Sequence, residues 1–148
     1  MRRRSRARGW ALQLLYAWET RDRVVPLAAL LDEFVGARRI AEANQEYLHT
    51  LVATIERNLP AIDAALERAL TNWRLERLSV IDRSILRIGG AELLYLDEIP
   101  PRVSIQEAIL LAEKYGTAES PRFVNGVLDA LMRRTGSAAG TAGPGEAR

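Results

Sequence analysis

The N-terminal residues 2–8 form a dense cluster of cationic side chains that could bind phosphate groups. Five of these seven residues are arginines and none is acidic: Arg2, Arg3, Arg4, Arg6 and Arg8. The whole chain has 21 basic and 19 acidic residues and a formal net charge of only +2. Outside this cluster, 16 basic residues are outnumbered by the 19 acidic ones. Positive charge is therefore concentrated at one end, which predicts a polyanionic partner held there.

A helical period aligns this cluster with an outward-facing aromatic residue. At 100° per residue, one side of a helix over residues 5–20 is apolar and expected in the core, with Ala7, Trp10, Ala11, Leu14, Leu15 and Trp18. The opposite side has Arg2, Arg6, Gly9, Gln13, Tyr16 and Thr20. Arginines that bind phosphates beside a ring that stacks on a base are typical of proteins that bind single-stranded RNA. The alternative is that Tyr16 packs against a neighbouring helix.

A second outward surface is predicted at the start of the last helix, in "SPRFVNGVL" (residues 120–128). Ser120 and Pro121 are expected as N-cap and first helical residue. Arg122 lies opposite the apolar stripe of this helix, and Phe123 and Asn125 flank the stripe. The Asn125 amide can read a base edge, and Gly126 lets another backbone approach. The alternative is that Asn125 bonds a loop and Gly126 allows tight helix packing.

A third surface is predicted on a helix over residues 79–96, which Ser79 and Asp82 open as a capping box. Arg83 and Arg87 are one turn apart and opposite the apolar stripe, so they are expected to be exposed, either to bind RNA or as a solvated face. The adjacent Gly89 and Gly90 each cost about 1 kcal/mol relative to Ala in a helix. Close approach of another helix is the expected compensation.

The composition speaks against catalysis. There is no Cys and only one His, His49, which excludes thiolate chemistry and a histidine metal cluster. Asp97 and Glu98 are adjacent and point in different directions, and no glycine-rich phosphate loop is present. The sequence therefore predicts a binding protein with no catalytic residue, no metal and no cofactor.

The chain reads as all-α, with seven helices joined by Pro-marked turns and a helix start at Pro60. Residues 1–135 are expected to form one helical domain, with bundles over about 5–70 and 71–135 and a disordered tail over 136–148. Ser104 with Glu107 is expected to cap the sixth helix, and the last helix is expected to end near Arg134. No apolar run is long enough for a membrane span, and the N-terminus makes a poor secretory signal, so a cytoplasmic protein is expected.

Three blocks of the chain stand out: "RSRARGWALQLLYAWE", "VIDRSILRIGGAELLY" and "VSIQEAILLAEKYGTAESPRFVNGVLDAL". In this order and spacing, over about residues 3–133, they resemble the NusB family of bacterial antitermination factors. The resemblance implies two small helical bundles and binding of boxA-type RNA from ribosomal-operon leaders. It also implies a ribosomal small-subunit protein as partner, and entry of the pair into the RNA polymerase elongation complex with other Nus factors.

Carried over by motif position, the resemblance implies an RNA surface made of the basic N-terminus with Gln13, Tyr16, Arg122, Phe123 and Asn125. It implies that Asp82 and Glu119 lie near the protein partner or the RNA interface. The "SPR" before Phe123 departs from the longer polar pair of many members and can alter that loop.

Three other readings stay open from the residues. One is the RNA-binding accessory domain of a ribosomal RNA methyltransferase. The expected helices and tail leave no room for the catalytic domain of such an enzyme. Another is an Arg-rich amphipathic membrane anchor, which Gln13 and Tyr16 on the cationic face oppose. The last is a homodimeric scaffold in which second helix faces bury one another.

Overall fold

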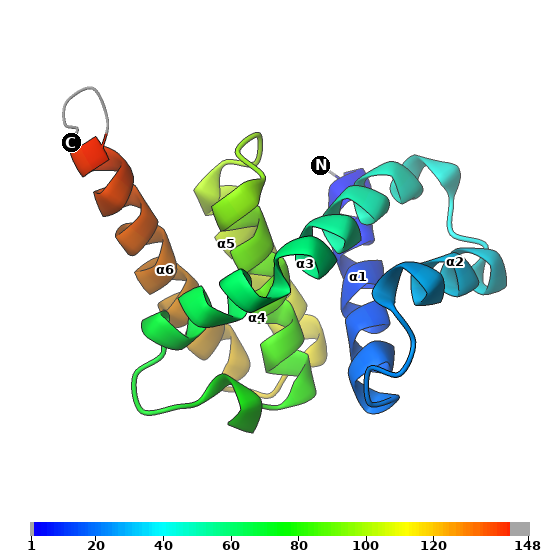
Figure 1. Cartoon of the computed structure of the whole chain (residues 1–148), viewed down its shortest axis with the longest axis horizontal. Helices are drawn as coiled ribbons and strands as arrows, with labels where there is room; N and C mark the ends of the chain where they lie inside the picture. Colours follow the sequence, from blue (N-terminus) through cyan, green and yellow to red (C-terminus); the bar gives the residue numbers. More distant parts are fainter. Residues whose placement is uncertain (1, 143–148) are drawn as a thin grey trace.

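The chain folds into helices throughout, as the computed structural model of residues 2–142 shows, with side chains described for residues 3–135 (Figure 1). The elements are α1 (Arg2–Thr20), α2 (Leu27–Arg38), α3 (Glu42–Ala69), the 3-10 helix η1 (Leu75–Arg77), α4 (Val80–Tyr95), α5 (Pro101–Tyr115) and α6 (Ser120–Ala142). No strand occurs among these residues, which confirms the all-α class. Six α-helices replace the expected seven.

The difference in number arises at Pro60, which does not begin a new helix. Helix α3 runs through it and bends at Asn58, whose φ of −119° and ψ of 18° are not helical. Proline removes a backbone donor and clashes with the preceding turn, so a kink here is expected. The Asn58 amide donates to the Thr54 carbonyl at 2.9 Å and satisfies a backbone acceptor beside the kink.

Because it is long and kinked, α3 crosses the molecule from the side of α2 to the side of α6 (Figure 1). It contacts α1 and α2 as well as α4 and α6. The division into two bundles near residue 70 therefore stays a prediction. Of the expected tail over 136–148, helix α6 includes the first part to Ala142, and residues 143–148 lie outside the described residues.

The predicted caps are confirmed in part. At α4 the Ser79 hydroxyl accepts from the backbone N–H of Asp82 at 3.1 Å. At α5 the prediction was wrong, because Pro101 takes the first helical position and Ser104 lies buried inside the helix. At α6, Ser120 is already helical, and its hydroxyl is used elsewhere.

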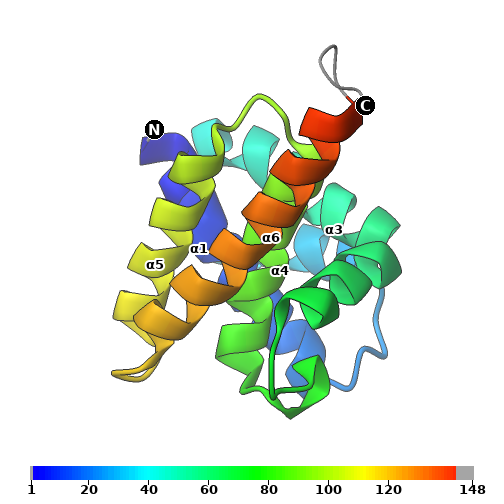
Figure 2. The same ribbon diagram turned by 90° about the vertical axis from the view of Figure 1, so that its left-hand side faces the viewer.

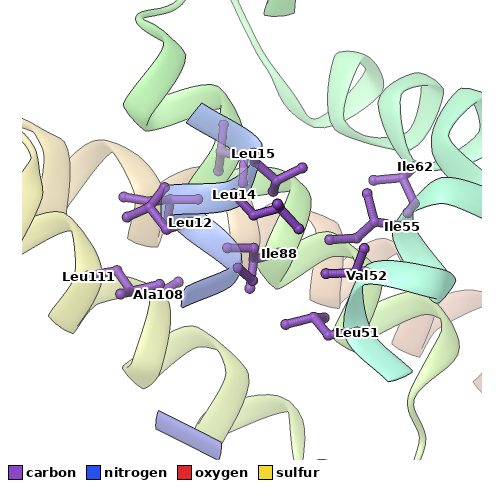
Figure 3. Close-up of a cluster of buried hydrophobic side chains, with 14 of the residues drawn as sticks. Leu12, Leu14, Leu15, Leu51, Val52, Ile55, Ile62, Ile88, Ala108 and Leu111 are labelled. Atoms are coloured by element: carbon purple, nitrogen blue, oxygen red, sulfur yellow. The ribbon is translucent and has the colours of Figure 1, made fainter. Parts of the chain in front are cut away.

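The core is made by apolar faces of all six α-helices, and α1, α3, α5 and α6 contact α4. Figure 3 shows the cluster, with buried side chains from α1, α3, α4 and α5: Leu12, Leu14, Leu15, Leu51, Val52, Ile55, Ile62, Ile88, Ala108 and Leu111. Helices α5 and α6 lie side by side and both contact α4 (Figure 2). None of the helices over residues 2–142 combines the length and apolar character needed to cross a bilayer.

The glycine pair of α4 is explained by close packing on two sides. A Cβ on Gly89 would lie 2.6 Å from a terminal methyl group of Leu128 in α6. A Cβ on Gly90 would lie 3.3 Å from Ile62 in α3. The predicted close approach is therefore confirmed, and it lets α4 sit between α3 and α6.

Candidate nucleic-acid interface

The N-terminal arginines divide into inward and outward groups because they sit on a helix. Arg3 and Arg6 are exposed. Arg4 is half-buried, with its guanidinium carbon 5.2 Å from the centre of the Tyr47 ring. The side chain of Arg2 lies outside the described part of the chain. Only some of the predicted phosphate-binding cations are therefore presented to solvent.

Arg8 is a correction, since the structure buries it and leaves it 1% exposed. Its Nε donates to Glu92 Oε2 at 2.6 Å, and its Nη1 lies 3.4 Å from Glu107 Oε1. The Tyr47 hydroxyl donates to the same Glu92 oxygen at 2.5 Å. Arg8 thus ties α1 to α3, α4 and α5 and does not face a ligand.

The ionisation of this group follows from its surroundings. Burial alone would lower the pKa of Arg8, but the hydrogen bond and charge of Glu92 raise it above its usual value. Burial and the Glu92 carboxylate both raise the pKa of Tyr47. The tyrosine therefore stays a neutral donor, and the arginine keeps its charge.

Arg83 and Arg87 are a second correction, because both are buried in the described structure. Arg87 donates to Asp63 through Nε and Nη2, each at 2.9 Å, and to Glu19 at 2.5 Å. Arg83 reaches Glu19 at 3.2 Å and donates to the Leu78 carbonyl at 2.7 Å. The face of α4 opposite its apolar stripe is covered by α1 and α3, so these arginines anchor helices.

Glu19 joins three arginines and is the acidic centre of this group. Burial alone would raise the pKa of Glu19, but hydrogen bonds from Arg23, Arg87 and Arg83 lower it to about 2. Burial would lower the pKa of Arg87, and the bonds to Asp63 and Glu19 raise it instead. Arg83 and Arg87 are both paired with buried or half-buried acids, so they are held in the structure and do not face a phosphate.

The outward face of α1 is confirmed. Gln13 is exposed, and Tyr16 is 45% exposed. Two shallow hollows flank this face and share Gln13 and Tyr115. The α1–α5 hollow has a volume of about 370 Å³ and includes Arg6 and Lys114. The α1–α2 hollow has a volume of about 510 Å³ and includes Tyr16 and Arg38.

Sequence reasoning missed Lys114, Tyr115 and Arg38 as neighbours of the outward face of α1. Tyr115 is the last residue of α5, and Arg38 is the last residue of α2. No sequence spacing could have placed them beside α1, because they come from separate helices.

The start of α6 carries the second predicted group. Arg122, Asn125 and Gly126 are exposed, and Phe123 is half-buried. Apart from its chain neighbours and the backbone of its own helix, no described atom lies within 4 Å of where a Gly126 Cβ would be, so the tight-packing explanation is wrong.

Phe123 lines a hollow of about 280 Å³ together with Asp82, Glu119, Ser120 and the exposed Trp73, called here the α4–α6 hollow. The Ser120 hydroxyl donates to Asp82 Oδ1 at 2.8 Å and accepts from the Thr117 backbone N–H at 3.0 Å.

The predicted residues thus form two neighbouring groups. Ile81 and Tyr115 line the α1–α2 hollow, while Asp82 and Thr117 line the α4–α6 hollow. The start of α4 and the end of α5 separate the two. Gln13 and Tyr16 lie on one side with cations, and Phe123 lies on the other with Asp82 and Glu119.

Known proteins match both the sequence and the fold. Residues 5–133 match the model of the NusB family. A transcription antitermination protein NusB from Bacillus mycoides is 43% identical over 131 residues, which cover 86% of this chain and 95% of that protein. Another from Chloroherpeton thalassium is 40% identical over 136 residues, or 90% of this chain, and this chain spans only 63% of its length.

A solved structure of the antitermination factors NusB and NusE with double-stranded RNA contains a similar chain. That chain has a TM-score of 0.81 and 33% identity, covering 90% of this chain and 98% of the other. The family match spans nearly all of the described helices, including both groups of surface residues. This chain belongs to the NusB family.

Proposed function

We propose that this protein is an RNA-binding transcription antitermination factor. It binds boxA-type leader RNA of ribosomal operons together with a ribosomal small-subunit protein, and the pair joins the RNA polymerase elongation complex with other Nus factors. The observation that carries this proposal is the exposed line of Arg6, Gln13 and Tyr16 on α1, flanked by further cations. Support comes from relatives that are antitermination proteins and from one solved with NusE and RNA.

The proposed RNA surface is the outward face of α1 with the start of α6. Arg3 and Arg6 supply charge for phosphates, while Gln13 and Tyr16 supply hydrogen bonds and a ring for bases. From Ser5 to Ala17 the helix rises about 18 Å at 1.5 Å per residue, about the length of five stacked nucleotides. Arg122 and Asn125, both exposed on α6, are the second part of the proposed RNA surface.

The α4–α6 hollow is the proposed contact for the protein partner. Its charged lining residues are Asp82, Glu119 and Arg77, so acids predominate, and Trp73, which is 58% exposed, gives it an aromatic rim. Buried aromatic anchors dominate the energy of many protein interfaces. Phe123 lines this hollow and is also next in sequence to Arg122, which is proposed to bind RNA. Binding of the protein partner and binding of RNA are therefore measured separately for Phe123 variants.

The proposal describes a cytoplasmic binding protein with no catalytic step. His49 is exposed, and its Nδ1 lies 2.7 Å from the Gln45 carbonyl of its own helix. It is therefore engaged locally rather than with a nucleophile.

Charge and stacking should separate in a salt titration with single-stranded boxA-type RNA. Replacing Arg3 and Arg6 by Ala should reduce the slope of log affinity against log salt by about 0.7 for each lost phosphate contact. Tyr16→Ala should lower affinity by about 1–3 kcal/mol and leave the slope unchanged. Fluorescence anisotropy at several salt concentrations measures both quantities.

The matched control is Arg57→Ala on α3, an exposed arginine outside the described hollows. A duplex of the same sequence shows whether unpaired bases are required. If all arginine variants, the control included, behaved alike, the basic arm would have no specific role in binding.

The partner surface predicts a different pattern. Trp73→Ala and Phe123→Ala should weaken binding of the ribosomal partner by about 2 kcal/mol each, the scale of an interface hot spot. Isothermal titration calorimetry with the purified partner measures this, and RNA affinity alone is measured in parallel. Tyr95→Ala removes an aromatic of similar exposure from the other end of α4 and should change nothing. If Tyr95→Ala and Trp73→Ala weakened partner binding equally, the α4–α6 hollow would not be the partner interface.

A further inference from the structure

The α1–α2 hollow has a feature that phosphate binding alone does not explain. An arginine in its wall lies over a phenylalanine: the Arg38 guanidinium carbon lies 3.7 Å from the centre of the Phe34 ring. Phe34 is 3% exposed and belongs to the core, whereas Arg38 is exposed. The guanidinium is thus backed by a buried ring and remains accessible to solvent.

The electrostatic surroundings leave this arginine available to a ligand. Within the described residues no carboxylate lies within ion-pair distance of Arg38. The buried Arg8, Arg83 and Arg87 differ, since each is held by acidic partners. A planar cation fixed by a ring underneath loses little conformational freedom when a second flat group stacks on it.

The rest of the hollow supplies what a nucleobase requires. Tyr16 adds an exposed ring and a hydroxyl, Gln13 adds an amide, and Tyr115 adds a second ring. The adjoining α1–α5 hollow brings Arg6 and Lys114, while its acid Glu107 already lies beside Arg8. The combined trough is therefore cationic and lined with rings, which complements a nucleotide strand better than an acidic peptide.

We propose that the α1–α2 hollow holds one unstacked base of the bound RNA, with the guanidinium plane of Arg38 as its stacking partner. Phe34 keeps that plane in position from below, and Gln13 and Tyr16 face the edge of the base. This assignment rests on the proposed function and adds a specific base-binding position to it.

Arg38→Lys tests the assignment, because it keeps the charge and removes the plane. The probe is single-stranded boxA-type RNA, as the intact strand and as a series in which each nucleotide in turn is abasic. The wild type should bind one of the abasic strands about 5- to 150-fold more weakly than the intact strand, the range for loss of a stacked base. Arg38→Lys should bind the intact strand more weakly by a similar factor, with an unchanged salt slope.

At the nucleotide whose base the wild type requires, removing the base should lower the affinity of Arg38→Lys much less than it lowers the affinity of the wild type. Arg39→Lys is the matched control, an exposed neighbour outside the hollow, and it should behave as the wild type. Circular dichroism checks that both variants stay folded, which is expected for exposed side chains.

Two results would overturn the assignment and leave the proposed function standing. In the first, the wild type binds RNA and Arg38→Lys binds it equally well, while Arg38→Ala reduces the salt slope, so that Arg38 contacts a phosphate. In the second, the abasic profile of Arg38→Lys is parallel to that of the wild type. A wild-type protein that binds no RNA at all would instead overturn the proposed function.

Discussion

Replacing Arg8 by Met should lower the free energy of unfolding by about 3–5 kcal/mol, because the change leaves buried acidic groups without their cation. Glu92 is 1% exposed and would keep only the Tyr47 hydroxyl as a partner, and Glu107 would lose its contact with Arg8. Methionine has a similar volume, so the loss of stability reflects the missing charge and hydrogen bond more than a cavity. Urea denaturation followed by circular dichroism measures the difference.

The matched control is Arg6→Met on the exposed side of the same helix, which should change stability by about 0.5 kcal/mol or less. The double variant Arg8→Met with Glu92→Leu should recover part of the loss, because a buried ion pair can often be replaced by apolar groups. Equal stability of the Arg6 and Arg8 variants would show that the buried pair contributes nothing.

Acid should remove about 3 kcal/mol of stability through Glu19. Its pKa is about 2 in the folded protein against an ordinary 4.5. A lowered folded pKa stabilises the protein above the unfolded value, and that stabilisation is lost as the pH falls from 4.5 towards 2. Glu19→Gln lacks the charge, so the stability difference between it and the wild type should be largest at neutral pH and shrink over this window.

Unfolding curves measured every half pH unit between 7 and 2 follow that difference. The partners around Glu19 are Arg23, Arg83 and Arg87, with Asp63 on the far side of Arg87, so no other acid replaces it. Glu56→Gln, an exposed acid on α3, serves as control and should stay parallel to the wild type. A constant difference for Glu19→Gln down to pH 3 would contradict the prediction.

The helical fold and the orientation of α1 could be predicted from the sequence because both depend on local periodicity. Tyr16 and Gln13 were placed outward, and the structure confirms it. Arg8 was misjudged because it was grouped by charge with its neighbours. Its spacing to Leu12 and Leu15, four and seven residues on, puts it on a buried stripe, which is a signal that the sequence did contain.

Other positions could not be predicted from one helix at a time. Periodicity places Arg83 and Arg87 opposite the apolar face of α4, but it does not show that α1 and α3 cover that side too. The position of Arg38 beside Tyr16 likewise depends on how α2 packs against α1. Ser104 fits a cap pattern, but Pro101 began the helix earlier. Except at Ser104, these errors concern contacts between helices, which a residue period does not contain.

The inward attachment of Arg4 and Arg8 has a thermodynamic consequence for the arginines that remain outside. A loose basic tail loses about 1–2 kcal/mol of backbone entropy for every residue that a ligand immobilises. Here Tyr47 and Glu92 hold the first turns of α1 in place, so that loss occurs when the chain folds. Arg3 and Arg6 are already at fixed spacing before a nucleotide strand arrives.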